Sequence, residues 1–562
     1  MQNNQESLKF AVMVRGSHMQ KWQLDCYTNL INSGFARNVL WIIEDEHSST
    51  ISTGIKLLNY PWRRLLFRQY YRHLFRPRYF SREAIPFDPE IPQAHCTALR
   101  KGKYSEYFTA ADIQKIQSYK PDFILKFGFG IIRGDILECT RFGVWSFHHG
   151  DEQKYRGVPP AFHEIMRNDP ETASILQRLT EKLDGGIILR KGIFKTINHS
   201  WAANLDQALE LSLKWPADVC REIITQKTFP GSGEGVKTNA PVYREPENFT
   251  MTQFLVKLAV NKIKFHLNEL FLPENWETGL IEASPEDLLG IHHYTIENDK
   301  VHWLSAGQRN RYLADSFALQ QGNKVILLFE DYDYHKMKAS LSAAIFDETT
   351  KKTGEVKSLL QEKWHLSYPF ILETEEGIFC IPESMHHGSV EMYKLDTEAL
   401  ELTHYKTLIP ELSAADGTLI HHQNHWYFFF TPPHATNTEL YIYHSKSLDG
   451  PFIPHTLNPV KINVANARPA GPFFTSNGNL YRPAQDSSET YGGRIIINRV
   501  KLLTPDDYLE ETANILLPPH GYKGIHTLSF AGKYMYFDSK KFRFSGAAFR
   551  NHLLKKLKLK HL

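Results

Sequence analysis

The sequence has few cysteines, no long apolar run and little net charge, and each of these absences narrows the class of protein. Its five cysteines form no Cys-X-X-Cys pair and no even-numbered framework, which indicates reduced thiols and not a disulfide scaffold. No apolar run approaches the ~20 residues of a membrane span, and the polar N-terminus lacks the pattern of a signal peptide. We therefore expect a cytoplasmic protein, whose contact with the inner membrane surface is at most peripheral.

The charge balance gives no global preference for a nucleic acid. Lys and Arg number 65 against 62 Asp and Glu, for a net charge of +3, so any basic surface must be local. The chain also lacks a strongly basic C-terminal domain that could engage the phosphates of a tRNA. A nucleic-acid partner is therefore not favoured, and the sequence does not set the oligomeric state.

The chain is too long for one hydrophobic core, and its periodicity changes near its middle. In the first ~230 residues short apolar strands alternate with helical patterns; the expected strands are 10–14, 39–43, 122–130 and 143–147. This alternation is typical of a parallel sheet with helices on both faces, in which ligands bind beyond the carboxyl ends of the strands. Both the segment 127–130 and His148 fall at such ends.

The second half repeats one unit of β-hairpin material five times. The Gly or Asn turns of the copies lie at 322, 377, 424, 478 and 532, which gives spacings of 55, 47, 54 and 54 residues. Five such copies predict a five-bladed β-propeller. The expected organisation is a Rossmann-like α/β domain at 8–228, a linker and helix at 229–273, the propeller at 274–545 and a basic tail at 546–562.

Two motifs in the first half carry proton-transfer chemistry. His148 and His149 close an apolar strand and lead into Tyr155-Arg156-Gly157, and Leu183-Asp184-Gly185-Gly186 follows later. A histidine titrates near neutrality and a carboxylate can orient it, so the pair offers the base that acyl transfer needs. A metal site of His148, His149 and Asp151 is disfavoured because adjacent histidines rarely face one ion, and we expect no metal.

These motifs resemble the signature of the formyltransferase family over roughly residues 8–225. His148 matches the catalytic histidine of that family, and Asp184 matches its catalytic aspartate. The resemblance implies formyl-tetrahydrofolate as donor of a formyl group to an amine. It also implies donor contacts from Phe127, Gly128, Phe129, Gly130, Tyr155, Arg156 and Gly157.

The chain departs from this family at one catalytic position. The asparagine of the family is Ser146 here. An amide can donate to the developing oxyanion, and the loss of one such donor costs roughly 2.7–4 kcal/mol of barrier. We expect the hydroxyl of Ser146 to take this role, helped by His149.

The repeats of the second half place charged residues where inner strands approach the central channel. These are Asp315, Asp416, Arg468 and His526, with Glu383 in the second repeat. Two or three acids around a hub are what glycoside hydrolysis requires, whereas acids that cap turns are the structural alternative.

The propeller resembles the arabinanase-type glycosidases and, more closely, the propeller domain of glucosamine inositolphosphorylceramide transferases. The second resemblance is carried by Ser367-Tyr368-Pro369-Phe370, Ile381-Pro382-Glu383-Ser384, Ala467-Arg468-Pro469-Ala470-Gly471, Tyr481-Arg482-Pro483-Ala484-Gln485-Asp486 and Gly524-Ile525-His526-Thr527. In that family sugar transfer belongs to another domain. The resemblance therefore implies glycan handling but no activity of the propeller itself.

Residues 62–82 contain seven arginines and no acid. Four of them recur at intervals of four residues, opposite an expected apolar stripe formed by Trp62, Leu66, Tyr70 and Leu74. This basic amphipathic helix, Trp62–Arg76, is expected to lie on an anionic membrane surface or to hold the diphosphate of an activated sugar. A solvated helix packed on its apolar side is the alternative.

The leading hypothesis is a folate-dependent N-formyltransferase for an amino sugar of a surface glycan or of its nucleotide- or lipid-linked precursor. His148 would be the base, Asp184 would orient it, and Ser146 would face the oxyanion, while the propeller holds the rest of the glycan. One alternative is a glycosidase- or glycan-transfer-type activity in the propeller beside a first domain that is not catalytic. The other is a glycan-binding protein without enzymatic activity.

Overall fold

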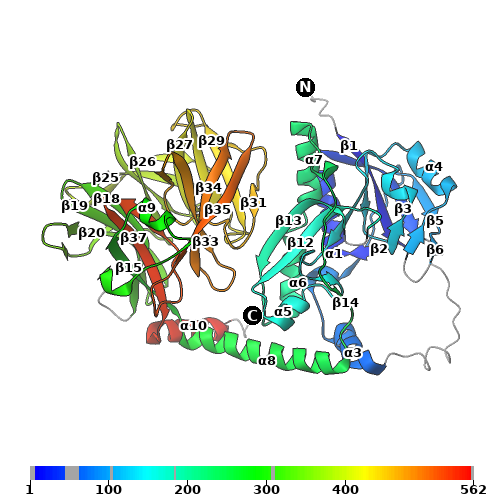
Figure 1. Cartoon of the computed structure of the whole chain (residues 1–562), viewed down its shortest axis with the longest axis horizontal. Coiled ribbons are helices and arrows are strands. Elements are labelled where there is room, and N and C mark those ends of the chain that lie inside the picture. The colour runs from blue at the N-terminus through cyan, green and yellow to red at the C-terminus, as the bar shows by residue number, and fades with distance from the viewer. Residues whose placement is uncertain (1–6, 45–61, 102–104, 183–184, 305–309, 559–562) are drawn as a thin grey trace. The chain divides into compact units, whose positions relative to one another are not determined.

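The computed structural model describes residues 7–44, 62–101, 105–182, 185–304 and 310–558, so Asp184 lies outside the described residues. The chain divides into two compact units, Met1–Lys262 and Ile263–Leu562 (Figure 1). The boundary falls within helix α8 (Asn248–Phe271). The domain bounds expected from the sequence are finer than this division and stay predictions.

A seven-stranded sheet forms the centre of the first unit, in the order β13-β12-β10-β8-β1-β3-β5. Five strands run parallel: β1 (Leu8–Arg15), β3 (Ala36–Glu44), β5 (Gln93–Cys96), β8 (Phe123–Lys126) and β10 (Val144–His148). The antiparallel strands β12 (Glu171–Arg178) and β13 (Ile187–Lys195) extend one edge. The predicted parallel sheet is confirmed. The strand expected at 122–130 ends at Lys126, which leaves Phe127–Gly130 as a turn at the carboxyl edge.

Helices cover both faces of this sheet, which explains why its parallel strands are apolar on both sides. On one face, Ile116 of α4 (Ala110–Ser118) is buried with Met13 and Ile124. On the other, Trp22 of α1 (Lys21–Asn32) and Trp201 of α6 (Trp201–Glu210) share a core. Helix α7 (Trp215–Gln226) contacts α1 and β13.

Short elements complete the first unit. The small sheets pair β2 (His18–Gln20) with β4 (Arg82–Ala84), β11 (Arg156–Gly157) with β14 (Val242–Tyr243), and β7 (Ser105–Tyr107) with β6 (Leu99–Lys101) and β9 (Ile131–Arg133). Helix α5 (His163–Arg167) follows β11.

The arginine-rich segment forms a 3-10 turn, Trp62–Arg64, and then helix α3 (Leu65–His73). Three residues of the expected apolar stripe are exposed: Trp62, Leu66 and Leu74 are 60%, 40% and 70% exposed, whereas Phe67 and Phe75 are 4% exposed. Of this stripe only Tyr70 packs inward, on Trp201, so the alternative of a helix packed on its apolar stripe is wrong for the other three residues, because the underlying core is aromatic. Trp201 stacks on Phe75 with 3.9 Å between the ring centroids, so the phenylalanines, and not the leucines, fill the interface.

Five sheets, antiparallel except where β16 pairs with β35, form the second unit, so the predicted propeller of five blades is confirmed (Figure 1). The first three blades consist of β18 (Arg311–Gln321), β19 (Lys324–Asp333), β20 (Lys338–Asp347), β21 (Lys352–Thr353) and β22 (Lys357–Leu360); β23 (Ser367–Thr374), β24 (Gly377–Glu383), β25 (Val390–Asp396) and β26 (Glu401–Ile409); and β27 (Ala415–His422), β28 (His425–Thr431), β29 (Glu439–Ser445), β30 (Ile453–Pro454) and β31 (Lys461–Ile462).

The last two blades combine strands from both ends of the unit. The fourth contains β32 (Phe474–Ser476), β33 (Asn479–Asp486), β34 (Arg494–Leu503), β35 (Tyr508–Leu517) and β16 (His293–Thr295); the fifth contains β36 (Leu528–Ala531), β37 (Tyr534–Phe542), β15 (Glu274–Glu282) and β17 (His302–Leu304). Pairing of β15 with β37 closes the ring.

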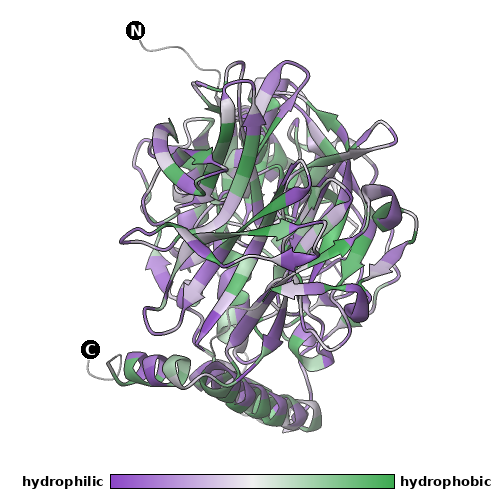
Figure 2. Ribbon diagram, turned by 90° about the vertical axis from the view of Figure 1, so that its left-hand side faces the viewer, coloured by the Kyte–Doolittle hydropathy of each residue, from purple (hydrophilic) through white to green (hydrophobic). Residues whose placement is uncertain are grey.

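Helix α10 (Gly546–Lys558) follows the propeller and contacts the end of α8, where Lys556 lies 2.7 Å from Glu269. Hydrophobic and hydrophilic residues alternate along these helices at the bottom of Figure 2. Among the described helices, none combines the length and the hydrophobicity that crossing a bilayer requires.

Candidate functional sites

The first candidate site lies at the carboxyl end of β10. Nε2 of His148, the last residue of this strand, lies 3.1 Å from the carbonyl oxygen of Tyr155. A carbonyl can only accept, so this contact places the proton on Nε2 and leaves Nδ1 as the basic nitrogen. Gly150 permits the contact, since a Cβ there would lie 2.8 Å from that carbonyl oxygen and 3.1 Å from Nε2.

Strand pairing brings Ser146 and Lys126 to the face of the sheet that His148 shares. Ser146 is paired with Lys126 of β8 and with Gln177 of β12, and alternate residues of β10 lie on one face. Burial lowers the pKa of Lys126 to about 8, against the opposing effect of Glu106. Sequence analysis missed Lys126, because only the register between β8 and β10 reveals its position. Its ammonium group is a donor on the same face as Ser146, under the influence of the Glu106 and Glu44 carboxylates.

The turn Phe127–Gly130 is held closely against the strand ends. The N–H groups of Phe127 and Gly128 both donate to the carbonyl of Met13, at 2.9 and 2.8 Å. The N–H group of Phe129 donates to the carboxylate of Glu44 at 3.0 Å, and that of Gly130 donates to the carboxylate of Glu106 at 2.6 Å. A Cβ at Gly128 would lie 2.5 Å from the backbone of β1. All four N–H groups are thus bonded within the chain, and the turn can offer a ligand its carbonyl oxygens.

The segment Tyr155–Gly157 acts as an anchor for His148. The hydroxyl of Tyr155 donates to Asp169 at 3.0 Å, and Arg156 donates to the carbonyl of Ala240 at 3.2 Å. Gly157 has φ of 90°, and a Cβ there would lie 2.2 Å from the carbonyl oxygen of Tyr243. These contacts give the three residues a positioning role, while their contact with a donor stays a prediction.

His149 does not assist Ser146, so that expectation was wrong. Nδ1 of His149 lies 3.0 Å from the hydroxyl of Ser174, and its ring meets the edge of Trp22 in the core on the other face of the sheet. Burial lowers the pKa of His149 to about 3, so the ring is neutral near pH 7. His148, His149 and Asp151 do not converge on one point, because the Asp151 carboxylate is bonded to Lys191.

A buried carboxyl group close to this site was also missed. Glu164 of α5 is 1% exposed, and its Oε1 has no hydrogen-bond partner among the residues that the structure describes. Burial raises its pKa to about 7, and the charges of Asp169 and Asp151 add to this effect. Its surroundings could not be foreseen, because a Glu in a short helix is usually exposed.

Glu164→Gln is expected to stabilise the first unit at pH 8 but not at pH 4.5. The folded-state pKa lies above that of the unfolded chain, so Glu164 costs stability as the pH rises from about 4.5 to 7, by ~1.4 kcal/mol per pH unit. Thermal unfolding of the full chain at both pH values measures this effect. An equal gain at both would show that the carboxylate charge is not the cause.

The second candidate site is the hub of the propeller, where all five predicted residues converge in two clusters. In the first, His526 lies 3.1 Å from Asp315 and 2.7 Å from Asp538. In the second, Arg468 binds both carboxylate oxygens of Asp416, at 2.5 and 3.1 Å. Glu383 accepts from the N–H of Asp416 at 3.1 Å. The convergence follows from the repeat, since equivalent strand starts meet at the axis.

A strained bulge recurs at this hub in three blades. Asp315, Tyr368 and Asp416 have φ of 52°, 45° and 50°, and strand pairing shifts register at each. Bulges turn backbone groups out of the ladder. The freed N–H groups of these residues donate to Asp538, Asp315 and Glu383, respectively. The acids therefore join neighbouring blades. This structural role differs from the turn capping that the sequence offered as the alternative to catalysis.

The hub also separates the charge states of neighbouring acids. Burial raises the pKa of Glu383 well above its usual range, and Asp416 adds to this effect, whereas Asp416 itself is paired with Arg468. Burial likewise raises the pKa of Glu330, a residue of β19 that sequence analysis missed. A protonated acid next to an ionised one is the arrangement that acid–base chemistry requires.

His526 makes the stability of the propeller dependent on pH. Burial would lower its pKa, but Asp538 and Asp315 raise it to about 10. Its stabilising effect is fully present below pH ~6.5 and declines by ~1.4 kcal/mol per unit up to pH ~10. We expect urea unfolding to show this decline in the native chain and not in His526→Gln. Parallel pH profiles for the two proteins would contradict it.

Asp315, His526 and Asp538 are also the described residues whose geometry best resembles a metal site, since their ligand atoms lie within 4.8 Å of one another. A protonated His526 lies between the two carboxylates and offsets part of their charge. We assign them as an ion triad, and the expectation that the chain binds no metal stays a prediction.

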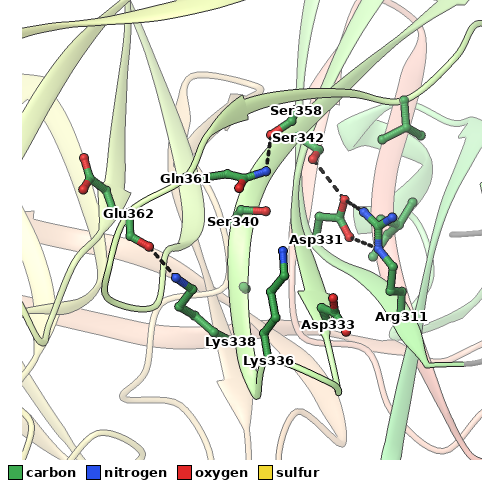
Figure 3. A pocket seen from close by; sticks show the side chains of 13 residues that line it. Arg311, Asp331, Asp333, Lys336, Lys338, Ser340, Ser342, Ser358, Gln361 and Glu362 are labelled. Carbon is green, nitrogen blue, oxygen red and sulfur yellow. Dashed lines mark hydrogen bonds and ion pairs between the residues drawn. The ribbon is translucent and has the colours of Figure 1, made fainter. Parts of the chain in front are cut away.

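A polar cavity of about 430 Å³ lies on the first blade (Figure 3). Arg311 in its wall is paired with Asp331, which also accepts from Ser342 at 3.1 Å. Lys338 donates to the carbonyl of Glu362. Asp333, Lys336 and Glu362 also line this cavity, so it offers charged groups as well as hydroxyl and amide groups.

Comparisons with known proteins divide the chain in the same way. Residues 300–542 match the family described as glucosamine inositolphosphorylceramide transferase 1, N-terminal. The enzyme of that name from Oryza sativa subsp. japonica is 32% identical over 215 residues, which are 37% of this chain and 29% of that protein. The chain thus spans less than a third of the length of this relative.

The N-terminal part is similar to other proteins. Methionyl-tRNA formyltransferase of a Wolbachia species from Drosophila simulans is 31% identical over 86 residues, 15% of this chain and 29% of that protein. The structure of glycinamide ribonucleotide transformylase 1 from Symbiobacterium toebii aligns with 39% of this chain and 89% of its own, at 14% identity and a TM-score of 0.28. The chain therefore joins a part similar to formyltransferases to a propeller similar to the N-terminal part of glucosamine inositolphosphorylceramide transferase 1.

Proposed function

We propose that the first unit transfers a formyl group to the amine of a sugar and that the propeller holds the rest of the glycan. The observation that carries this proposal is the placement of His148 at the carboxyl edge of the sheet, with Nδ1 as the basic nitrogen and with Ser146 and Lys126 on the same face. Similarity to formyltransferases and to a sugar-transferring enzyme supports the two halves of the proposal.

The residues of the first site would divide the chemistry between them. Nδ1 of His148 takes a proton from the attacking amine and returns it to the departing nitrogen of the donor, so that one carbon–nitrogen bond forms and one breaks. Ser146 and Lys126 donate to the oxygen on which negative charge develops. Asp184, as the resemblance implies, orients His148.

The carboxyl edge fits a folate-type donor, which would supply the formyl group. The turn Phe127–Gly130 uses its N–H groups within the chain and can present carbonyl oxygens. Carbonyl oxygens are acceptors, the partners that an amino-substituted pterin ring requires. The ring of Phe127 packs on Trp22 and that of Phe129 on Phe108, so both rings hold the turn in place.

Binding of a donor analogue tests the proposal. The full chain should bind a non-reactive analogue of formyl-tetrahydrofolate in calorimetric titration, and Gly128→Val should abolish binding, because a side chain there collides with β1. Gly233→Val is the matched control, because a Cβ there would meet no heavy atom within 4 Å and its φ of −78° suits a side chain. Absence of binding to the native chain would exclude folate as the donor.

The hub favours a second candidate function, glycoside hydrolysis. Glu383 with a raised pKa could protonate a leaving group, and Asp416, paired with Arg468, could act as base or nucleophile. Loss of glycan turnover in Glu383→Gln but not in His148→Ala would favour this function over formyl transfer.

A further inference from the structure

Helices α3 and α8 present apolar side chains to solvent on the first unit. The side chain of Asn248 donates to the carbonyl of Trp62 at 2.8 Å and accepts from the N–H of Leu66 at 3.0 Å. This brings the start of α8 against α3. Phe249, next to Asn248, is 75% exposed. Trp62, Leu66 and Phe249 thus lie at neighbouring positions with exposed apolar side chains, although soluble helices normally turn such residues inward.

The same face continues along the first half of α8. Val256 and Val260 follow Phe249 at spacings of seven and four residues, which places all three on one side of the helix. Both valines are more than half exposed, while Met251 and Phe254 on the other side are buried in the core. Core packing therefore accounts for one side of α8 and leaves the exposed apolar side unexplained.

Basic residues surround this apolar surface. Residues 62–82 and 248–262 contain seven arginines and two lysines but no acid. Glu245 is shared between Arg64 and Arg68, at 3.5 and 3.8 Å. The surface thus carries excess positive charge beside exposed Trp, Leu, Val and Phe side chains. This combination is typical of helices that lie in the headgroup region of an anionic bilayer.

A pocket of about 440 Å³ opens between α3 and the loop Val158–Pro160. Arg68, Arg72 and Glu245 line it, so two guanidinium groups outnumber one carboxylate, and guanidinium groups bind phosphate through paired hydrogen bonds. The loop continues from Tyr155, whose carbonyl oxygen holds His148. A phosphate in this pocket would therefore contact the segment that positions the proposed base.

We propose that Trp62, Leu66, Phe249, Val256 and Val260 insert into an anionic lipid surface and that Arg68 and Arg72 bind a lipid phosphate. A nucleic acid would use the arginines but not the apolar stripe. The lack of acids in residues 62–82 and 248–262 favours an anionic surface over an acidic protein of undefined shape. This inference is independent of the proposed formyl transfer.

Co-sedimentation of the full chain with vesicles tests this inference. The native chain should bind phosphatidylcholine vesicles that contain phosphatidylserine, and should bind pure phosphatidylcholine much more weakly. Phe249→Ser and Arg72→Glu should each weaken binding about tenfold. Leu509→Ser and Lys363→Glu change exposed residues of the propeller and should have no effect.

Several results would overturn the inference. One is a native chain that does not bind anionic vesicles. Another is binding that pyrophosphate abolishes while Phe249→Ser leaves it unchanged, which would assign the arginines to a soluble phosphate. A third is a dimer in light scattering that Phe249→Ser dissociates without vesicle binding, because the surface would then join two copies of the chain. Thermal unfolding confirms that each variant is folded.

Discussion

His148→Ala is expected to lower the rate of formyl transfer by about 10²- to 10⁴-fold, the range that a positioned base contributes. The residue ends a strand and is only partly buried, and the one hydrogen bond described for its ring is with Tyr155. Loss of this ring should therefore affect the reaction far more than the stability. Steady-state rates and thermal unfolding of the full chain measure the two effects separately.

Two controls sharpen this prediction. His18→Ala removes an exposed histidine from the same unit and should leave the rate unchanged. Added imidazole should restore part of the activity of His148→Ala, because it can occupy the vacated space as a base, whereas it cannot repair a misfolded site. An undiminished rate in His148→Ala would remove this histidine from the mechanism.

Arg468→Ala is expected to destabilise the propeller by about 3–5 kcal/mol, the typical cost of breaking a buried ion pair. Arg468 binds Asp416 with two nitrogen atoms and lies 4.0 Å from Glu383. Its removal leaves a carboxylate without its cation at the hub, where Asp416 is 2% exposed. Urea unfolding of the full chain measures the loss.

A double substitution separates the charge from the lost side chain. Arg468→Met with Asp416→Asn removes both partners, so it should recover much of the stability that Arg468→Met alone loses. Additive losses in the double variant would show that the two residues do not interact, and would contradict the assigned pair.

Regular spacing made the fold accessible from the sequence. The turns near Gly322, Gly377, Asn424, Gly478 and Gly532 mark one hairpin per blade, so counting them gives the number of blades. The same logic placed Asp315, Asp416, Arg468 and His526 at the hub, because equivalent positions of a repeat meet at its axis. These inferences need only local patterns along the chain.

Contacts between distant segments could not be inferred in this way. Lys126 and Ser146 are neighbours through the pairing of β8 with β10, and Glu330 reaches the hub from the second strand of a blade, outside the repeated turn motif. On α3, helical spacing offered packing through Leu66 and Leu74 as one alternative, but the aromatic surface of Trp201 selects Phe67 and Phe75. Each of these outcomes depends on tertiary packing, which overrides a local pattern.

Transfer of a formyl group to the amine of a sugar is tested most directly with a ¹³C-labelled formyl group followed by nuclear magnetic resonance. The full chain is incubated with labelled formyl-tetrahydrofolate and amino sugars in free, nucleotide-linked and lipid-linked form. We predict that the label moves to the sugar nitrogen as a formamide and that His148→Ala prevents this transfer. Two results would contradict the proposed formyl transfer. In one, the label stays on the donor with every acceptor; in the other, it leaves the donor only as formate, at a rate independent of the sugar.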